Sequence, residues 1–293
     1  MPDMNSLQTT VPNRVLDALG RRPLPAAWSA QAAPAAVAIN AEPRLRLQVS
    51  WARHDDELRQ AQRLRHRVLA DRPGAAIPGI GSAPPAGTPP ELDVDRFDGH
   101  CEHLLLRTLA SDTTPAWLVA TCRILTPAGA RRAGGLHGET LFDLSRLAAL
   151  RPRIVELGRC WVDPAWRGSA VMPALGSALA DFMLHNDLDI GFGCASLPLH
   201  DGGHHAASLW RRLQRSHAAS DRLAAIPWLP MPIKALRDDL QAAPPALLQG
   251  LLQCGAKLLG APAWDPDFGS AELPMILQLA YLPAAFRLRP LLC

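Results

Sequence analysis

The chain has 293 residues, enough for one large domain or two modest ones. Apolar residues make up 48% of it and charged residues 19%, so there is material for a real core and wholesale disorder is excluded. A net charge of +3, from 30 basic and 27 acidic residues, is too balanced to indicate a nucleic-acid-binding protein.

The first 43 residues have the composition of a flexible leader. They carry an Ala/Pro-rich tract without a stable period, and no basic segment followed by an apolar one, as a signal peptide would have. No segment has the roughly 20 apolar helical residues of a membrane span. The six cysteines form no CxxC pair, which favours reduced thiols. We therefore predict a cytoplasmic protein with a leader over 1–43 and one domain over 44–293.

Hydrophobic periodicity predicts alternating strands and helices after the leader. Short apolar or alternating runs predict strands at 45–49, 103–108, 117–125, 154–162, 190–197 and 275–282. Helical spacing predicts helices at 54–70, 167–185, 206–217 and 246–259. A Gly/Pro-rich stretch at 71–90 predicts a long loop. This order of elements is typical of an α/β fold.

Conventional catalytic and metal-binding motifs are absent from the sequence. It contains no P-loop, no GxGxxG and no GxSxG. The densest histidine cluster, His200, His204 and His205, falls in a Gly-rich turn without a compatible carboxylate or cysteine pairing. A solvated loop is favoured over a metal site there, and we expect no bound metal.

Charged residues inside apolar strands are the strongest local signal. Arg123 lies within one such run, and Glu156 and Arg159 lie within another. A buried charge is costly unless it is paired, so these residues indicate either a functional site or a structural ion pair. Glu156 and Arg159 would point to opposite faces of a regular strand, although Gly158 could permit a bulge that changes this.

Five segments, in this order, carry a family resemblance: Arg65–Leu69, Asp95–Asp98, Cys101–Leu105, Thr121–Leu125 and Glu156–Arg159. Together they resemble the acyltransferases related to acyl-homoserine lactone synthases. That family has the fold of the GNAT acetyltransferases but takes acyl groups from acyl carrier protein. Each segment is weak alone, and their order makes the resemblance specific.

Further segments resemble one branch of that family, the L-ornithine Nα-acyltransferases. These are Gly138–Leu144, Phe192–Pro198 and a C-terminal block at about 244–285. Homoserine-lactone synthases are generally shorter and lack such a block. The resemblance implies a GNAT-like α/β fold, with a central mixed sheet flanked by helices and a C-terminal extension.

The implied reaction transfers a 3-hydroxyacyl group from acyl carrier protein to the α-amino group of L-ornithine. It forms lyso-ornithine lipid, the first step of ornithine lipid biosynthesis. The donor is the phosphopantetheine thioester of the carrier protein, and no cofactor is bound. Because the product is amphiphilic, peripheral membrane contact is an additional expectation. Two alternatives stay open: an acyltransferase with another amine acceptor, such as a homoserine-lactone synthase, and a non-catalytic module that binds lipid or carrier protein.

The resemblance also assigns roles to residues. Glu156 would accept the proton of the attacking amine, and Arg159 would pair with Glu156 or with the acid group of the amine substrate. Amides beside 160–162 would stabilise the oxyanion. The residues expected to build the substrate site are Arg65, Asp95, Asp98 and Arg123.

Arg167 and Gly168 occupy the place where N-acetyltransferases hold pyrophosphate at a helix N-terminus. The full glycine-rich pattern of those enzymes is missing. A phosphopantetheine donor has a single phosphodiester, which is consistent with a weaker loop. We therefore expect these two residues to bind phosphopantetheine, with an ordinary helix start as the alternative.

Overall fold

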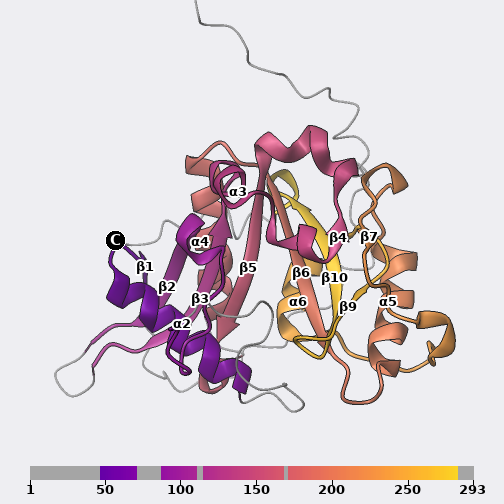
Figure 1. Cartoon of the computed structure of the whole chain (residues 1–293), viewed down its shortest axis with the longest axis horizontal. Helices are drawn as coiled ribbons and strands as arrows, with labels where there is room; N and C mark the ends of the chain where they lie inside the picture. The colour runs from indigo at the N-terminus through magenta and orange to yellow at the C-terminus, as the bar shows by residue number, and fades with distance from the viewer. Residues whose placement is uncertain (1–46, 71–86, 111–114, 168–170, 283–293) are drawn as a thin grey trace, which may run out of the picture.

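The structure is a computed structural model that describes residues 47–70, 87–110, 115–167 and 171–282. Figure 1 draws the other residues as a thin grey trace. The predicted leader at 1–43, Gly168 and most of the predicted loop at 71–90 lie outside the described residues. The division into a leader and one domain therefore stays a prediction.

A mixed β-sheet forms the centre of the molecule (Figure 1). Its strands are β1 (Leu47–Trp51), β2 (Glu102–Thr108), β3 (Leu118–Leu125), β5 (Ile154–Val162), β6 (Ile190–Pro198), β8 (Lys257–Leu258), β9 (Ala263–Asp265) and β10 (Ser270–Gln278). The strand order is β1-β2-β3-β5-β6-β10-β8, and β9 also pairs with β10. Neighbouring strands are antiparallel except β5 and β6, which are parallel. A separate pair joins β4 (Phe142–Asp143) to β7 (Ile226–Pro227).

Helices cover both faces of the sheet. They are α2 (Asp55–Ala70), α3 (Pro127–Ala133), α4 (Val171–His185), α5 (His204–His217) and α6 (Ala246–Gln253). Helix α2 packs on β2, β3 and β5, and α4 packs on β1 and β3 from the opposite face (Figure 1). All residues of β3 after Leu118 are buried as a result. The expected α/β architecture, a central mixed sheet flanked by helices, is confirmed.

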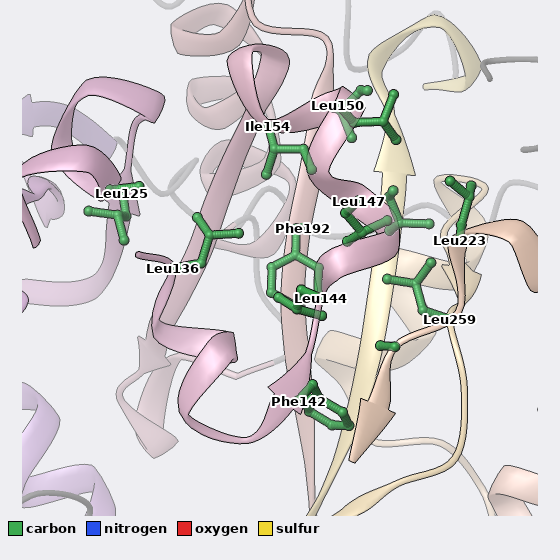
Figure 2. Close-up of a cluster of buried hydrophobic side chains, with 14 of the residues drawn as sticks. Leu125, Leu136, Phe142, Leu144, Leu147, Leu150, Ile154, Phe192, Leu223 and Leu259 are labelled. Atoms are coloured by element: carbon green, nitrogen blue, oxygen red, sulfur yellow. The ribbon is translucent and has the colours of Figure 1, made fainter. Parts of the chain in front are cut away.

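Short 3₁₀ helices connect these elements. They are η3 (Asp98–His100), η4 (His137–Thr140), η5 (Ser145–Arg153), η6 (Pro164–Trp166), η7 (Asp221–Leu223), η8 (Ile233–Ala235) and η9 (Leu279–Tyr281). The segment from η4 to η5 is anchored by an apolar cluster, in which Leu136, Leu144 and Leu147 pack with Ile154 and Phe192 (Figure 2). Each of these five side chains is at most 2% exposed. This packing fixes η4 beside the first half of β5, where Glu156 lies.

The predicted boundaries differ from the structure mainly in the C-terminal block. The helix predicted at 246–259 ends at Gln253, because Gly255 adopts a left-handed φ of 84° and the chain then enters β8. Leu248 and Leu252 of α6 are buried in the core. The strand predicted at 275–282 instead begins at Ser270 and ends at Gln278. Its first half was missed because the acidic Glu272 and Pro274 interrupt the apolar pattern.

Candidate active site

A cleft opens where β5 and β6 separate. The parallel pairing of these strands ends at Glu156 and Phe192. Beyond that point both strands, together with α4, α6 and β10, line a cavity of about 560 Å³. Its walls are largely apolar, and its charged or titratable lining side chains include Arg123, His137, Glu156, Arg159, Asp265 and Glu272. The cleft therefore combines a long apolar space with polar groups near Glu156.

Glu156 lies at the point where the strands divide, and its side chain is 5% exposed. Its two carboxylate oxygens accept hydrogen bonds from the backbone amides of His137 at 2.6 Å and Gly138 at 2.7 Å. Burial nevertheless raises its pKa to about 7, because the amides offset only part of the lost hydration. Within the described ranges Glu156 has no arginine or lysine in an ion pair.

His137 borders the same cavity but is a poor base. Burial, with the positive charges of Arg123 and Arg159 nearby, lowers its pKa to about 3, so its ring is neutral at pH 7. His137 and Gly138 both contact Glu156 through their backbone amides, which donate hydrogen bonds to its carboxylate. Sequence reasoning did not identify this support, because a backbone donor has no signature in the side-chain pattern.

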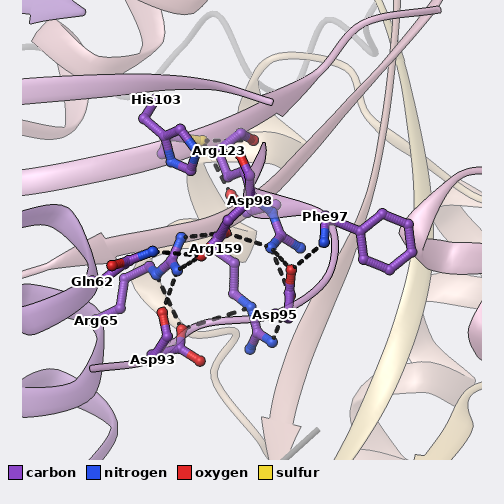
Figure 3. A network of polar contacts seen from close by, with 11 residues as sticks. Gln62, Arg65, Asp93, Asp95, Phe97, Asp98, His103, Arg123 and Arg159 are labelled. Atoms are coloured by element: carbon purple, nitrogen blue, oxygen red, sulfur yellow. Dashed lines mark hydrogen bonds and ion pairs between the residues drawn. The ribbon is translucent and has the colours of Figure 1, made fainter. Parts of the chain in front are cut away.

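A buried network of arginines and aspartates adjoins the cleft (Figure 3). Its charged members are Arg65, Arg123, Arg159, Asp93, Asp95 and Asp98. Arg65 donates to the two oxygens of Asp98 at 3.1 and 2.6 Å. Arg123 donates to Asp95 at 2.6 Å and to Asp98 at 3.0 Å. Burial alone would raise the pKa values of Asp95 and Asp98. The neighbouring arginines outweigh this effect and hold both pKa values below their usual range.

The structure thus brings together all four residues predicted for the substrate site. Their contacts are chiefly with one another and not with the cavity. Arg123 also lines the cavity, whereas Arg65, Asp95 and Asp98 are not among its lining residues. The contacts of these three residues join α2 and η3 to β3. Direct contact of these three residues with substrate stays a prediction. In the structure they form a rigid wall behind Arg123.

Arg159 lies on a β-bulge at the middle of β5. The register with β3 shifts between Thr121 and Arg123, and Arg159 itself adopts a left-handed φ of 48°. The bulge anticipated from Gly158 is present, although the left-handed residue is Arg159. Its guanidinium donates to Asp95 at 3.2 Å, so the pairing with Glu156 considered from the sequence is not formed. Arg159 also lines the cavity.

Two cysteines lie opposite each other on β3 and β5, directly before the register shift. Cys122 on β3 and Cys160 on β5 form a disulfide, with their Cα atoms 4.0 Å apart. The expectation of reduced thiols is therefore wrong for this pair, since the register of Ala120 with Val162 and of Thr121 with Trp161 continues to Cys122 and Cys160. Cys101, Cys194 and Cys254 are free.

The remaining predicted residues lie away from the centre of the cleft. Arg167 is an exposed residue directly after η6. The histidine-rich segment forms a turn that leads into α5, where Asp201 accepts the amides of Gly203 and His205. Over the described ranges we find no group of three metal-ligating side chains, and no helix with the length and apolar character needed to cross a membrane.

Part of the sequence matches a known domain family. Residues 76–177, which contain Glu156 and the bulge, match the acetyltransferase (GNAT) domain family. Among solved structures, the chain is similar to the acyl-homoserine lactone synthase LasI, with 15% identity over 80% of this chain and 91% of that one and a TM-score of 0.45. The N-acyl amino acid synthase FeeM from uncultured soil microbes gives 12% identity over 80% and 92%, with a TM-score of 0.46.

The domain match, together with the similarity to curated acyltransferases, gives the class of protein: the chain is an acyltransferase with a GNAT-like fold. Its sequence is similar to curated L-ornithine N(alpha)-acyltransferases. The protein from Brucella abortus is 28% identical over 251 residues, which cover 82% of this chain and 87% of the relative. The protein from Rhodobacter capsulatus is 35% identical over 153 residues, which cover 52% and 57%.

Proposed function

We propose that the chain transfers a 3-hydroxyacyl group from acyl carrier protein to the α-amino group of L-ornithine, which forms lyso-ornithine lipid. The observation that carries this proposal is the position of Glu156, a buried carboxylate with a pKa of about 7 on the wall of a large apolar cavity. The similarity to four curated L-ornithine N(alpha)-acyltransferases supports the choice of acceptor.

Glu156 acts as the base in this reaction. The α-ammonium group must lose a proton before its nitrogen can attack, and a carboxylate with a pKa near the working pH suits that transfer. The nitrogen attacks the thioester carbonyl and forms a tetrahedral intermediate. After attack, the nitrogen of the intermediate loses a second proton, and the C–S bond breaks so that the sulfur leaves as a thiolate. Of the two protons lost by the ammonium group, one passes through Glu156 to the sulfur and the other is released to solvent. The products are the amide and the free carrier thiol, without a covalent enzyme intermediate.

The two halves of the cavity suit the two substrates. The acyl chain lies along the apolar walls from α4 and α6, where Leu175, Leu179 and Leu248 line the cavity. The thioester carbonyl lies beside β5 beyond Glu156, where β6 no longer pairs with the strand. Backbone amides at 160–162 are the donors for the oxyanion. Arg159 supplies positive charge for the carboxylate of the amino acid.

The carrier protein is the source of the acyl group in this proposal, and Arg167 and Gly168 bind the phosphate of its phosphopantetheine arm. An enzyme that uses a free thioester, or another amine, would have the same catalytic centre. The donor and the acceptor must therefore be varied independently in the experiment.

The experiment is an in vitro assay of the full chain with 3-hydroxyacyl thioesters of acyl carrier protein or coenzyme A, each paired with a panel of free amino acids. Mass spectrometry should detect N-acylornithine, with release of the carrier thiol. Glu156→Gln serves as the inactive control. Acylation of other amines without ornithine would reject the proposed acceptor. If no amine is acylated, the protein is a non-catalytic binding module and the proposed function is wrong.

A further inference from the structure

Two buried carboxylates besides Glu156 line the active-site cavity. Asp265, the last residue of β9, is 8% exposed, and Glu272 on β10 is 5% exposed. Glu272 accepts hydrogen bonds from the hydroxyls of Ser196 and Ser270 at 3.0 and 2.7 Å. The proposed acyl transfer assigns no role to either carboxylate.

Asp265 lies where the main cavity meets a smaller one of about 340 Å³, and it lines both. One of its oxygens accepts the backbone amide of Phe268 at 3.1 Å. In the described part of the chain no arginine or lysine forms an ion pair with it, in contrast to the aspartates that face Arg65 and Arg123. Burial raises its pKa because the Phe268 amide offsets only part of the lost hydration. The positive charge of Arg159 lowers this pKa by less than the backbone amides of Phe268 and Asp267 do. A buried carboxylate without an ion pair is costly, so this position suits a positively charged ligand.

The three carboxylates line the same cavity as Cys194. The thiol of Cys194, on β6, has a pKa raised first by burial and then by the negative charges of Glu272, Glu156 and Asp265. All four side chains line the same cavity. The wall formed by β6, β9 and β10 is therefore acidic, while the wall beside the bulge of β5 carries Arg159.

Aromatic residues border the smaller cavity as well. Trp228, Trp264 and Phe268 line it together with Asp265. The ring of Phe268 already has the guanidinium of Arg159 at 4.6 Å from its centroid. Aromatic faces attract cations and are less strongly hydrated than carboxylates, so they favour an alkyl-ammonium group over a metal ion.

We infer that Asp265 binds the distal ammonium group of a diamino-acid acceptor at the junction of the two cavities. This inference rests on the proposed function and identifies the site that selects the acceptor side chain. The α-amino group lies at Glu156, and the methylene chain of the substrate spans the distance to Asp265. Glu272 adds negative charge to the same wall while its serine partners hold it in place.

Such a site discriminates strongly against amino acids without the second amine. An acceptor that lacks the ammonium leaves Asp265 buried and unpaired, and this penalty is larger than the loss of one apolar contact. Norvaline has the same carbon chain as ornithine without the δ-amine. The ratio of kcat/KM for ornithine to that for norvaline therefore measures the contribution of this site alone.

The test compares Asp265→Asn with the wild-type chain on these two acceptors. Asparagine keeps an oxygen to accept the Phe268 amide but removes the charge. We expect the ornithine-to-norvaline ratio to fall by roughly 10- to 100-fold, mainly through a higher KM for ornithine, while turnover of norvaline is kept. Retained norvaline turnover also reports that the variant is folded.

Asp187→Asn is the matched control. Asp187 is an exposed residue with a left-handed φ of 53°, which asparagine also accepts, so the change removes one negative charge without strain. Its ornithine-to-norvaline ratio should equal that of the wild type. An unchanged ratio in Asp265→Asn, or an equal loss of activity on both acceptors, would overturn the inference.

Calorimetric titration separates failure of this inference from failure of the proposed function. The wild-type chain should bind ornithine more tightly than norvaline without any acyl donor, and Asp265→Asn should bind both alike. If ornithine binds with this preference but is never acylated, the proposed function is wrong and the ammonium site stands. If ornithine is acylated and the preference does not depend on Asp265, the ammonium site is wrong and the function stands.

Discussion

The backbone amide of Gly138 donates to the carboxylate of Glu156 at 2.7 Å, and only glycine fits at this position. A Cβ atom on residue 138 would lie 2.5 Å from the ring of Phe192 and 3.3 Å from the Glu156 carboxylate. Phe192 is buried in the cluster that anchors the segment from η4 to η5. The position of the base therefore depends on close packing between η4 and β6.

Gly138→Ala should disturb both the packing and the base. Because the Phe192 ring is confined, the added methyl group pushes η4 away from β5, at a cost of about 1–3 kcal/mol in the free energy of unfolding. Acyl transfer should fall at least tenfold as the amide moves from Glu156. Chemical denaturation and steady-state kinetics measure the two effects. Gly99→Ala, where a Cβ meets nothing within 4 Å, is the control and should change neither.

The pH dependence of catalysis should follow Glu156. Its carboxylate must be ionised to accept a proton, so kcat/KM should rise with pH and level off above about 7. Glu156→Gln should lower kcat by roughly 10²- to 10⁴-fold and remove this rise. Release of carrier thiol, followed from pH 5 to 9, measures both. The exposed Glu102→Gln should behave as the wild type; a Glu156→Gln variant with full activity at pH 7 would show that another group is the base.

The free energy of unfolding should also depend on the protonation of Glu156, but it should fall with rising pH where kcat/KM rises. Burial raises the pKa of Glu156 from 4.5 to about 7, so the folded state holds the proton more tightly than the unfolded state. The resulting stabilisation is complete below pH 4.5 and is lost as pH rises through 7, a change on the order of 3 kcal/mol. The difference in unfolding free energy between the wild type and Glu156→Gln, measured at pH 4.5 and pH 8, should therefore shift in favour of the variant. An equal difference at both pH values would contradict the raised pKa.

The sequence was informative where a charge interrupts an apolar strand. Arg123, Glu156 and Arg159 were found in this way, and the family resemblance then assigned Glu156 as the base. The ion-pair partner of Arg159 was not predictable from the sequence. Arg159 bonds to Asp95, which is 64 residues away, and not to its neighbour Glu156.

Other parts of the site have no local signature. The amides at residues 137 and 138 act through the backbone, so their side chains do not report them. Asp265 ends a strand of three residues, too short for a periodic pattern, and only the antiparallel pairing with β10 places it beside the cavity. The disulfide between Cys122 and Cys160 depends on the pairing register of β3 and β5, which cysteine spacing does not reveal.

Two arginines on α2 test whether the buried network stabilises the fold. Arg65 is 2% exposed and binds Asp98 through two nitrogens, whereas Arg67 is 52% exposed and pairs with Asp163. Arg65→Gln leaves a buried carboxylate short of its cation and should cost about 3–5 kcal/mol. Arg67→Gln on the same helix should cost less than about 1 kcal/mol. Thermal and urea unfolding measure both, and similar losses in the two variants would contradict a structural role for the network.

The length of the acyl chain should be controlled at Gly250 on α6. This residue lines the apolar part of the cavity, and a Cβ there would have no heavy atom within 4 Å. Gly250→Leu places a branched side chain in that open space, so long acyl donors should lose kcat/KM while short ones keep it. Gly250→Ala is the graded control: it should stabilise α6 by up to about 1 kcal/mol, because alanine favours the helix, and shift the chain-length preference little. Competition between thioesters of different length, read by mass spectrometry, measures the preference. An unchanged length profile in Gly250→Leu would mean that the acyl chain lies elsewhere, since the added side chain would then border no bound substrate.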